Sequence, residues 1–260
     1  MRSTITSTVL STLFFLSSLS SITVIAQVNI CPGSAPFDMT GAVNWGNGTP
    51  GSCTQASLQT LINAGGKIKC NCGSAPFTLV LTSTLTIPLQ EVIIDGGNNV
   101  TISGNNSVRI FDKLPAANQA GGKLFGLQNI VLANGKAVSK TNELGGGAIF
   151  GRAFGSMKIV NVDFINNEGP LSASDDCGAV HTILYKEVIF SNCTFRNNRG
   201  ANGGAVGTIG SAMFFTNCSF YNNSATGTGG TFDKGGSGGA IYVDGVDQNG
   251  VTNFMSICGC

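Results

Sequence analysis

The sequence predicts an all-β protein, a right-handed parallel β-helix (a solenoid) with a short N-terminal capping α-helix. Three observations carry this prediction: two short motifs that alternate along the second half of the chain, many short runs with period-two alternation, and an unusual composition. Gly accounts for 37 of 260 residues, and charged residues make up only 10 %, against a usual share of about a quarter. With 42 % hydrophobic residues, including 16 Phe, the chain can bury a large core and is not a disordered polymer.

The first motif is a small residue followed by Gly, Ala and an aliphatic residue. It occurs at 146–149, 177–180, 203–206 and 238–241, and successive Ala positions lie 31, 26 and 35 residues apart. This spacing indicates one β-helix coil per repeat, with insertions confined to loops. Gly before Ala allows a sharp corner and a close approach of neighbouring coils, which a Cβ atom would obstruct.

The second motif is Phe-x-x-Asn, at 164–167, 195–198 and 220–223, with successive Phe positions 31 and 25 residues apart. Runs such as 157–160, 188–190 and 213–215 are too short to bury a face alone, so we expect them to stack coil on coil in parallel. Equivalent residues should then form files along the axis. The predicted files are Phe164, Phe195 and Phe220; Val162, Cys193 and Cys218; Asn161, Asn192 and Asn217; and Asn167, Asn198 and Asn223.

Upstream, the runs 79–81, 85–87, 92–97, 100–104 and 108–111 also predict short strands between Gly and Asn turns, and 127–134 resembles a degenerate repeat turn. The β-helix is therefore predicted over 67–260. The preceding N-terminal cap, 27–66, contains an amphipathic helix over 54–64 with Leu58, Leu61 and Ile62 on one face. This helix is expected to cover the apolar end of the first coil.

The two chain ends carry further expectations. Arg2, an apolar stretch up to Ile25 and the small residue Ala26 predict a signal peptide over 1–26, with an uncleaved signal anchor as the alternative. The predicted location is secreted, extracellular or at the cell surface, with no membrane insertion after cleavage. At the other end, 256–260 aligns with 191–195, so we expect the chain to stop in the first strand of a new coil and the β-helix to be truncated there.

Nine Cys residues in an exported chain predict disulfides. Cys31, Cys53, Cys70 and Cys72 lie near the predicted mature N-terminus, where they could staple the cap. The C-x-C pairs at 70–72 and 258–260 lack the His and Cys partners of a zinc site, so no metal is expected. Six N-x-S/T sequons are candidate N-glycosylation sites: Asn47, Asn99, Asn105, Asn192, Asn217 and Asn222.

The charge balance argues against two classes of partner. The chain has 14 basic and 13 acidic residues and a formal net charge of +1. Since no Lys/Arg cluster is present to neutralise phosphates or anionic lipid, neither nucleic-acid binding nor electrostatic membrane binding is expected.

The alternating motifs resemble the repeats of the polymorphic outer membrane protein family, whose passenger regions are β-helices implicated in adhesion. They are also similar to secreted β-helix proteins of the pectin-lyase-like superfamily. The resemblance covers about 67–260, and it implies the fold more specifically than any function.

The superfamily includes enzymes, so the resemblance implies candidate catalytic residues. Asp175 and Asp176 are similar to the paired aspartates of polygalacturonases, where two carboxylates serve as acid and base, and His181 is the chain's one His. The other motifs of that family are missing, which leaves these three as weak candidates.

Lyase chemistry would need a Ca²⁺ site and a base. Arg152, Arg196 and Arg199 are available bases, but the acidic residues are scattered: Asp95, Asp112, Asp163, Asp233, Asp244 and Asp247.

The sequence therefore favours a non-enzymatic protein that presents a rigid, neutral, Asn-, Ser- and Thr-rich face to an extracellular polysaccharide or to a cell-surface or matrix protein. The alternative is a pectin-lyase-like polysaccharide lyase or glycoside hydrolase acting on a polyuronide. No cofactor is expected, except Ca²⁺ under the lyase alternative. An ice-binding solenoid would need a regular Thr-x-Thr file, which Thr82, Thr84, Thr86 and Thr101 do not supply.

Overall fold

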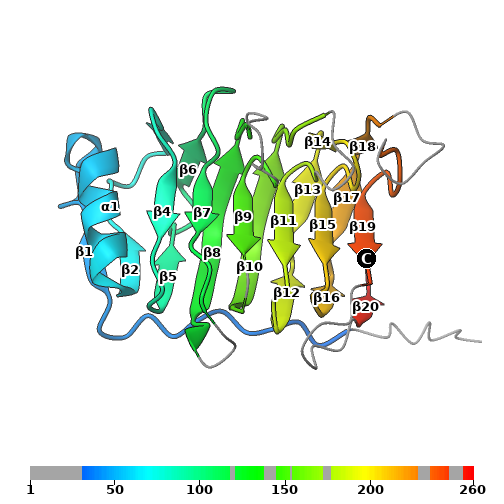
Figure 1. Ribbon diagram of the computed structural model, residues 1–260. Helices are drawn as coiled ribbons and strands as arrows, with labels where there is room; N and C mark the ends of the chain where they lie inside the picture. The colour runs from blue at the N-terminus through cyan, green and yellow to red at the C-terminus, as the bar shows by residue number, and fades with distance from the viewer. Residues whose placement is uncertain are drawn as a thin grey trace, which may run out of the picture.

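The computed structural model of the chain is a parallel β-helix, as the repeats predict (Figure 1). It describes residues 31–117, 121–137, 145–152, 154–171, 177–227, 235–245 and 254–260. Within these ranges every strand pairing is parallel, and one short α-helix, preceded by a 3₁₀ turn, lies before the first coil. Both parts of the predicted fold class are confirmed.

The elements follow one another in coils. The cap contains β1 (Val43–Trp45), the 3₁₀ turn Pro50–Ser52 and α1 (Gln55–Ala64). The next two coils contain β2 (Gly66–Cys70), β3 (Phe77–Val80) and β4 (Leu85–Ile87), then β5 (Val92–Asp95), β6 (Val100–Ser103) and β7 (Phe111–Lys113). They are followed by β8 (Leu124–Ala133), β9 (Ile149–Arg152), β10 (Ser156–Ile165) and β11 (Val180–Ile183). The remaining strands are β12 (Glu187–Ser191), β13 (Thr194–Arg196), β14 (Arg199–Gly200), β15 (Val206–Ile209), β16 (Met213–Thr216), β17 (Ser219–Tyr221), β18 (Ser224–Ala225), β19 (Ile241–Asp244) and β20 (Met255–Cys258).

The coils present three faces. The first face has the strand order β1-β2-β5-β8-β10-β12-β16-β20. The second face contains β3, β6, β13 and β17 together with the second halves of β8 and β10, which run around the corner and join the first two faces into one sheet. The third face has the order β19-β15-β11-β9-β7-β4. Strands distant in sequence are thereby brought into register, one coil apart.

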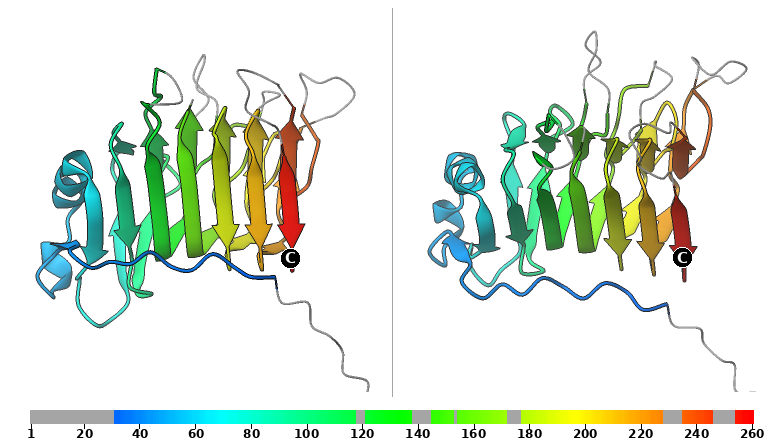
Figure 2. Two further views of the ribbon diagram at one scale, coloured as in Figure 1. Left: turned by 90° about the horizontal axis from the view of Figure 1, so that it is seen from below. Right: turned by 60° about the horizontal axis from the view of Figure 1, so that its bottom comes forward.

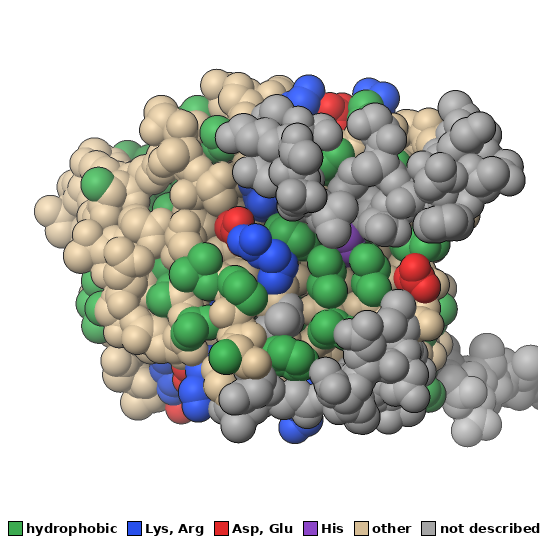
Figure 3. Space-filling view, viewed as in Figure 1, with side chains coloured by type: hydrophobic (Ala, Val, Ile, Leu, Met, Phe, Trp, Pro, Cys, Tyr) green, Lys and Arg blue, Asp and Glu red, His purple; other side chains and the backbone are tan. Residues whose placement is uncertain are grey.

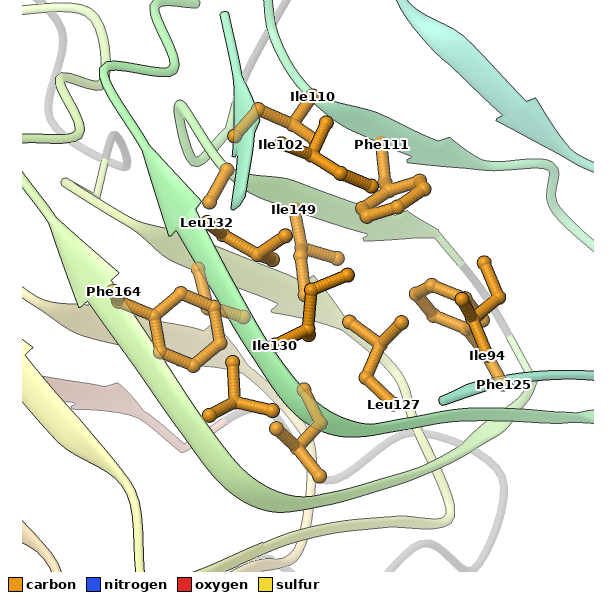
Figure 4. Close-up of a cluster of buried hydrophobic side chains, with 14 of the residues drawn as sticks. Ile94, Ile102, Ile110, Phe111, Phe125, Leu127, Ile130, Leu132, Ile149 and Phe164 are labelled. Atoms are coloured by element: carbon orange, nitrogen blue, oxygen red, sulfur yellow. The ribbon is translucent and has the colours of Figure 1, made fainter. Parts of the chain in front are cut away.

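Side chains from all three faces fill the interior, as Figure 4 shows for Ile94, Phe111, Leu132 and Phe164 among others. The predicted aromatic file is confirmed. The rings of Phe164 and Phe195 stack at 4.7 Å between centroids, and those of Phe195 and Phe220 at 4.9 Å, both nearly parallel. A second stacked pair, Phe190 and Phe215 at 5.1 Å, was not predicted.

The corners explain the Gly-Ala and Asn repeats. A Cβ atom on Gly178 would lie 1.8 Å from the carbonyl oxygen of Gly204 in the next coil, so this corner requires glycine, as predicted. At the other two corners Asn takes left-handed backbone angles, which it tolerates better than most residues. These residues are Asn98, Asn129, Asn161, Asn192 and Asn217 between the first and second faces, and Asn106, Asn134, Asn166, Asn197 and Asn222 after the second face.

Helix α1 covers the end of the first coil, as predicted (Figure 1). Thr54 caps it through its side chain, which accepts a hydrogen bond from the backbone N–H of Ser57. Leu58 and Ile62 are fully buried and Leu61 is half-buried. The disulfide Cys53–Cys72 ties the cap to the first coil, so the expectation that cysteines staple the cap holds for this pair.

Residues 31–41, which we call the strap, run along the first face from the β20 end of the solenoid to the α1 end (Figure 2). The disulfide Cys31–Cys258 fixes its start to β20 across a sequence separation of 227 residues. The Phe37 ring lies over Gly126, where a Cβ atom would come within 2.6 Å of it, and the Lys158 Nζ lies 4.6 Å from the ring centroid. The prediction that Cys31 belongs with the cap cysteines was therefore wrong, because the strap carries it to the opposite end.

The last strand also corrects the sequence alignment. Cys258 pairs with Thr216, which pairs with Ser191. The predicted match of 256–260 with 191–195 was therefore off by two residues, and Cys260, rather than Cys258, corresponds to Cys193. Gly259 has a φ of 69° and takes the left-handed place of Asn192. β20 pairs with β16 and continues the first face, so the segment does form a strand there, as expected.

Candidate functional site

The sequence-predicted catalytic residues do not form a described site. Asp175 and Asp176 lie outside the described residues. His181 lies on β11 on the outer side of the third face and is completely buried, and neither of its ring nitrogens has a hydrogen-bond partner among the residues that the structure describes. Burial, together with the nearby Arg109 charge, lowers its pKa to about 3. The imidazole is therefore neutral near pH 7.

A charged cluster lies next to His181. The guanidinium carbons of Arg109 and Arg152 lie 4.9 and 5.0 Å from the centroid of the Phe150 ring, which is itself 5.6 Å from the His181 ring. Arg152 donates to both oxygens of Asp112, at 2.8 and 3.0 Å, and Arg109 lies 3.5 Å from the same carboxylate. On the face shown in Figure 3, acidic and basic side chains accordingly lie together among hydrophobic ones. The charge of Arg152, one of the available bases, is thus already paired with a carboxylate.

The other acidic residues remain apart. Asp95 accepts from the backbone N–H of Gly97 at 2.9 Å, as in an Asx turn, and also from the amides of Gln128 and Asn129. Asp163 lies on the second face and Asp244 on the third, whereas Asp233 and Asp247 fall outside the described residues. In the described part of the chain no group of three or more His, Cys, Asp or Glu side chains is arranged to hold a metal ion.

A row of asparagines, which we call the outer ladder, consists of Asn129, Asn161 and Asn192 at the corner between the first and second faces; Asn161 and Asn192 are exposed and Asn129 is half-buried. Asn161 donates through Nδ2 to the Asn129 Oδ1 at 3.0 Å, and Asn192 donates to the Asn161 Oδ1 at 3.2 Å. The predicted row therefore exists, but it differs at one end. Asn217 donates to the carbonyl of Cys31 in the strap, at 3.2 Å, because the strap crosses the coils there.

A shallow groove of about 200 Å³ follows the outer ladder. Its second wall is the outward file of the second face, in which Val131, Asp163 and Thr194 are in register. The groove is lined by amides, aliphatic carbons and one carboxylate: Asn98, Asn129, Ile130, Val131, Asn161, Asp163 and Asn192. Such a surface can offer many hydrogen bonds along one direction with little charge.

Another hollow, of about 620 Å³, lies between α1 and the turn after β3, and it is also lined by amides and hydroxyls. Here the amides already hold the cap in place. Gln55 accepts from the backbone N–H of Thr82 and donates to Ser83, and Gln59 accepts from the N–H of Thr86 and donates to its carbonyl. The amides of Gln55 and Gln59 in this hollow therefore serve the attachment of the cap to the first coil.

The predicted row Asn167, Asn198 and Asn223, which we call the inner ladder, is confirmed and points into the coil. Asn167 and Asn198 are at most 1 % exposed. The Oδ1 of Asn198 accepts from both the backbone N–H and the Nδ2 of Asn167, at 2.9 and 3.0 Å, and the Asn198 Nδ2 donates to the Phe164 carbonyl and to Asn223. No amide group of Asn198 is left for a ligand.

The sequon asparagines divide by exposure. Asn47, Asn105, Asn192 and Asn222 are exposed, and Asn99 and Asn217 are half-buried. The amide of Asn99 donates to the Gly73 carbonyl at 2.7 Å, so folding contacts already use the amides of both half-buried residues. Asn192 belongs to the outer ladder, so a glycan attached there would stand in the groove.

Comparison of the chain with protein families, with curated proteins and with solved structures found no match. The geometry alone defines the structural class of the chain, which is that of parallel β-helix proteins with stacked asparagines at the corners. Among the described residues no helix is long and apolar enough to span a bilayer.

Proposed function

We propose that this protein is secreted and binds an extracellular, uncharged polysaccharide along the outer ladder. The apolar stretch before Ala26 and the two disulfides Cys53–Cys72 and Cys31–Cys258 support export to an oxidising compartment. The observation that supports the binding role is the row of left-handed asparagines, two of them exposed and one half-buried, whose amides repeat once per coil.

The amides of the outer ladder have hydrogen-bonding groups that the ladder itself does not use. Each Asn side chain offers two donors and two acceptor lone pairs, and Asn161 uses one donor towards Asn129 and one lone pair for Asn192. The rest face the groove or solvent. Because coils repeat at roughly 4.8 Å, an extended polymer of hydroxyl-rich units lying along the groove can meet successive amides.

Charge favours a neutral ligand over a polyuronide. The groove contains the Asp163 carboxylate and no Lys or Arg side chain among its lining residues. A carboxylate repels the carboxylates of an anionic polymer, whereas it accepts hydrogen bonds from sugar hydroxyls. The same groove suits hydroxyl-rich surfaces of a glycosylated cell-surface or matrix protein.

The structure offers a matched pair of variants for the test. Asn161 and Asn166 have φ values of 54° and 55°, are both exposed, and each donates to the asparagine of the preceding coil. Asn161→Gly removes an outer-ladder amide while keeping the left-handed turn, and Asn166→Gly does the same at the other corner.

Calorimetric titration with galactomannan, hydroxyethyl cellulose and polygalacturonate should show binding of a neutral polymer. Asn161→Gly should weaken that binding about fivefold, as expected for about 1 kcal/mol of hydrogen bonding, with Asn166→Gly unchanged. Binding of polygalacturonate alone, or equal effects of the two variants, would contradict the proposal. Release of unsaturated products or reducing ends would instead support the alternative of a carbohydrate-active enzyme, with Asp175, Asp176 and His181 as the residues to substitute first.

A further inference from the structure

Three cysteines form a file at the β20 end of the solenoid. Cys193, Cys218 and Cys260 each donate through Sγ to the carbonyl two residues earlier, at 3.4, 3.5 and 3.6 Å. Each also follows a left-handed residue, which is Asn192, Asn217 and Gly259 in turn. The corrected register of β20 thus extends the predicted file of Val162, Cys193 and Cys218 by one more thiol.

The outer two residues of this file, Cys218 and Cys260, are in contact. The backbone N–H of Cys218 donates to the Sγ of Cys260 at 3.3 Å, and β16 and β20 pair in register directly before them, Thr216 with Cys258. Cys260 is exposed, whereas Cys193 and Cys218 are 1 % and 2 % exposed. A reagent in solution therefore reaches Cys260 before it reaches the other two.

The three thiols also differ in their pKa values. Hydrogen bonding with Cys193 lowers the pKa of the Cys218 thiol to about 7, whereas burial raises the pKa of Cys193 and of Cys260. Near neutral pH Cys218 is therefore the best nucleophile of the file, because the thiolate is the reactive form.

We propose that Cys218 and Cys260 are an oxidation site that forms a disulfide on exposure to a small disulfide such as oxidised glutathione. In the first step the Cys260 thiolate, after losing its proton to solvent, attacks one sulfur of oxidised glutathione and releases a glutathione thiolate. In the second step the Cys218 thiolate attacks the Cys260 sulfur of this mixed disulfide and releases the second glutathione. Two protein thiols are oxidised, and one oxidised glutathione becomes two reduced molecules.

The bond would hold β20 from a second side. β20 is already held from outside by Cys31–Cys258, and a Cys218–Cys260 bond would hold the same segment from inside. This gives a role to the C-x-C pair 258–260, whose two cysteines lie on opposite sides of the coil wall. The inference is independent of the proposed binding function.

The test is peptide mapping by mass spectrometry, with free thiols alkylated before and after incubation of the protein with oxidised glutathione. The expected result is a Cys218–Cys260 cross-link while Cys193 stays alkylatable. In Cys218→Ser, a stable glutathione adduct should accumulate on Cys260, because the resolving thiol is gone. Cys193→Val copies Val162 in the same file, and it should still form the cross-link, but the glutathione adduct on Cys260 should be resolved about tenfold more slowly at pH 7 because Cys218 loses the hydrogen bond that favours its thiolate.

Three results would overturn the proposal. One is a Cys193–Cys218 cross-link with Cys260 still reactive, another is a stable glutathione adduct on Cys260 in the unmodified protein, and the third is no loss of thiols from the file.

Discussion

The inner and outer ladders are built from the same residue at the same coil spacing, yet they differ in what surrounds the amide. In the inner ladder, Asn198 bonds backbone groups of Asn167 and Phe164 as well as the neighbouring amides. In the outer ladder, the Asn161 side chain bonds, among the residues that the structure describes, only the asparagines above and below it. A buried amide must satisfy all of its polar groups to avoid a desolvation cost, whereas an exposed amide can leave some for water or for a ligand. The inner ladder therefore contributes to stability, whereas the outer ladder keeps the unused hydrogen-bonding groups on which the proposed binding depends.

The largest expected loss of stability comes from a substitution in the aromatic file, which precedes the inner ladder in each coil. Phe195 is fully buried and stacks on Phe164 and Phe220, whereas Phe220 is half-buried. Phe195→Ala should lower the free energy of unfolding by about 4 kcal/mol in a urea melt, and Phe220→Ala should lower it clearly less. Equal losses would mean that residues beyond Phe220 cover it as fully as a complete coil would.

A smaller loss is expected from the inner ladder itself. Asn198→Ala leaves the backbone N–H and the side-chain amide of Asn167 and the carbonyl of Phe164 without these partners, which should cost about 3 kcal/mol in the same melt. The matched outer-ladder change, Asn192→Gly, keeps the left-handed turn and should cost less than about 0.5 kcal/mol. Similar costs for the two variants would remove the distinction between the ladders.

The repeats made the fold predictable because each coil reuses the same positions. The stacked Phe164, Phe195 and Phe220, the inner ladder and the glycine corner at Gly178 all follow from residues that recur at one coil spacing. The capping helix was predictable for a local reason, since Thr54 and the apolar face at Leu58 and Ile62 are contained in one short segment.

The strap could not be predicted, because its contacts occur once and join distant segments. Nothing periodic links Phe37 to Gly126, or Cys31 to Cys258. The register of β20 was misjudged because Cys258 was matched to Cys193 by residue type, whereas the left-handed turn at Gly259 is the feature that repeats. Likewise, the unused hydrogen-bonding groups of Asn161 depend on its exposure. Because both ladders consist of asparagines, the residue type alone could not distinguish them.

The most direct test of the central claim is a titration of the ¹⁵N-labelled protein with a neutral oligosaccharide, observed through the side-chain amide signals of the asparagines. The signals of Asn129, Asn161 and Asn192 should shift with the ligand, while those of Asn167 and Asn198 stay in place. Shifts confined to the inner ladder or to the region of Arg152 and His181, with the outer ladder unaffected, would contradict it.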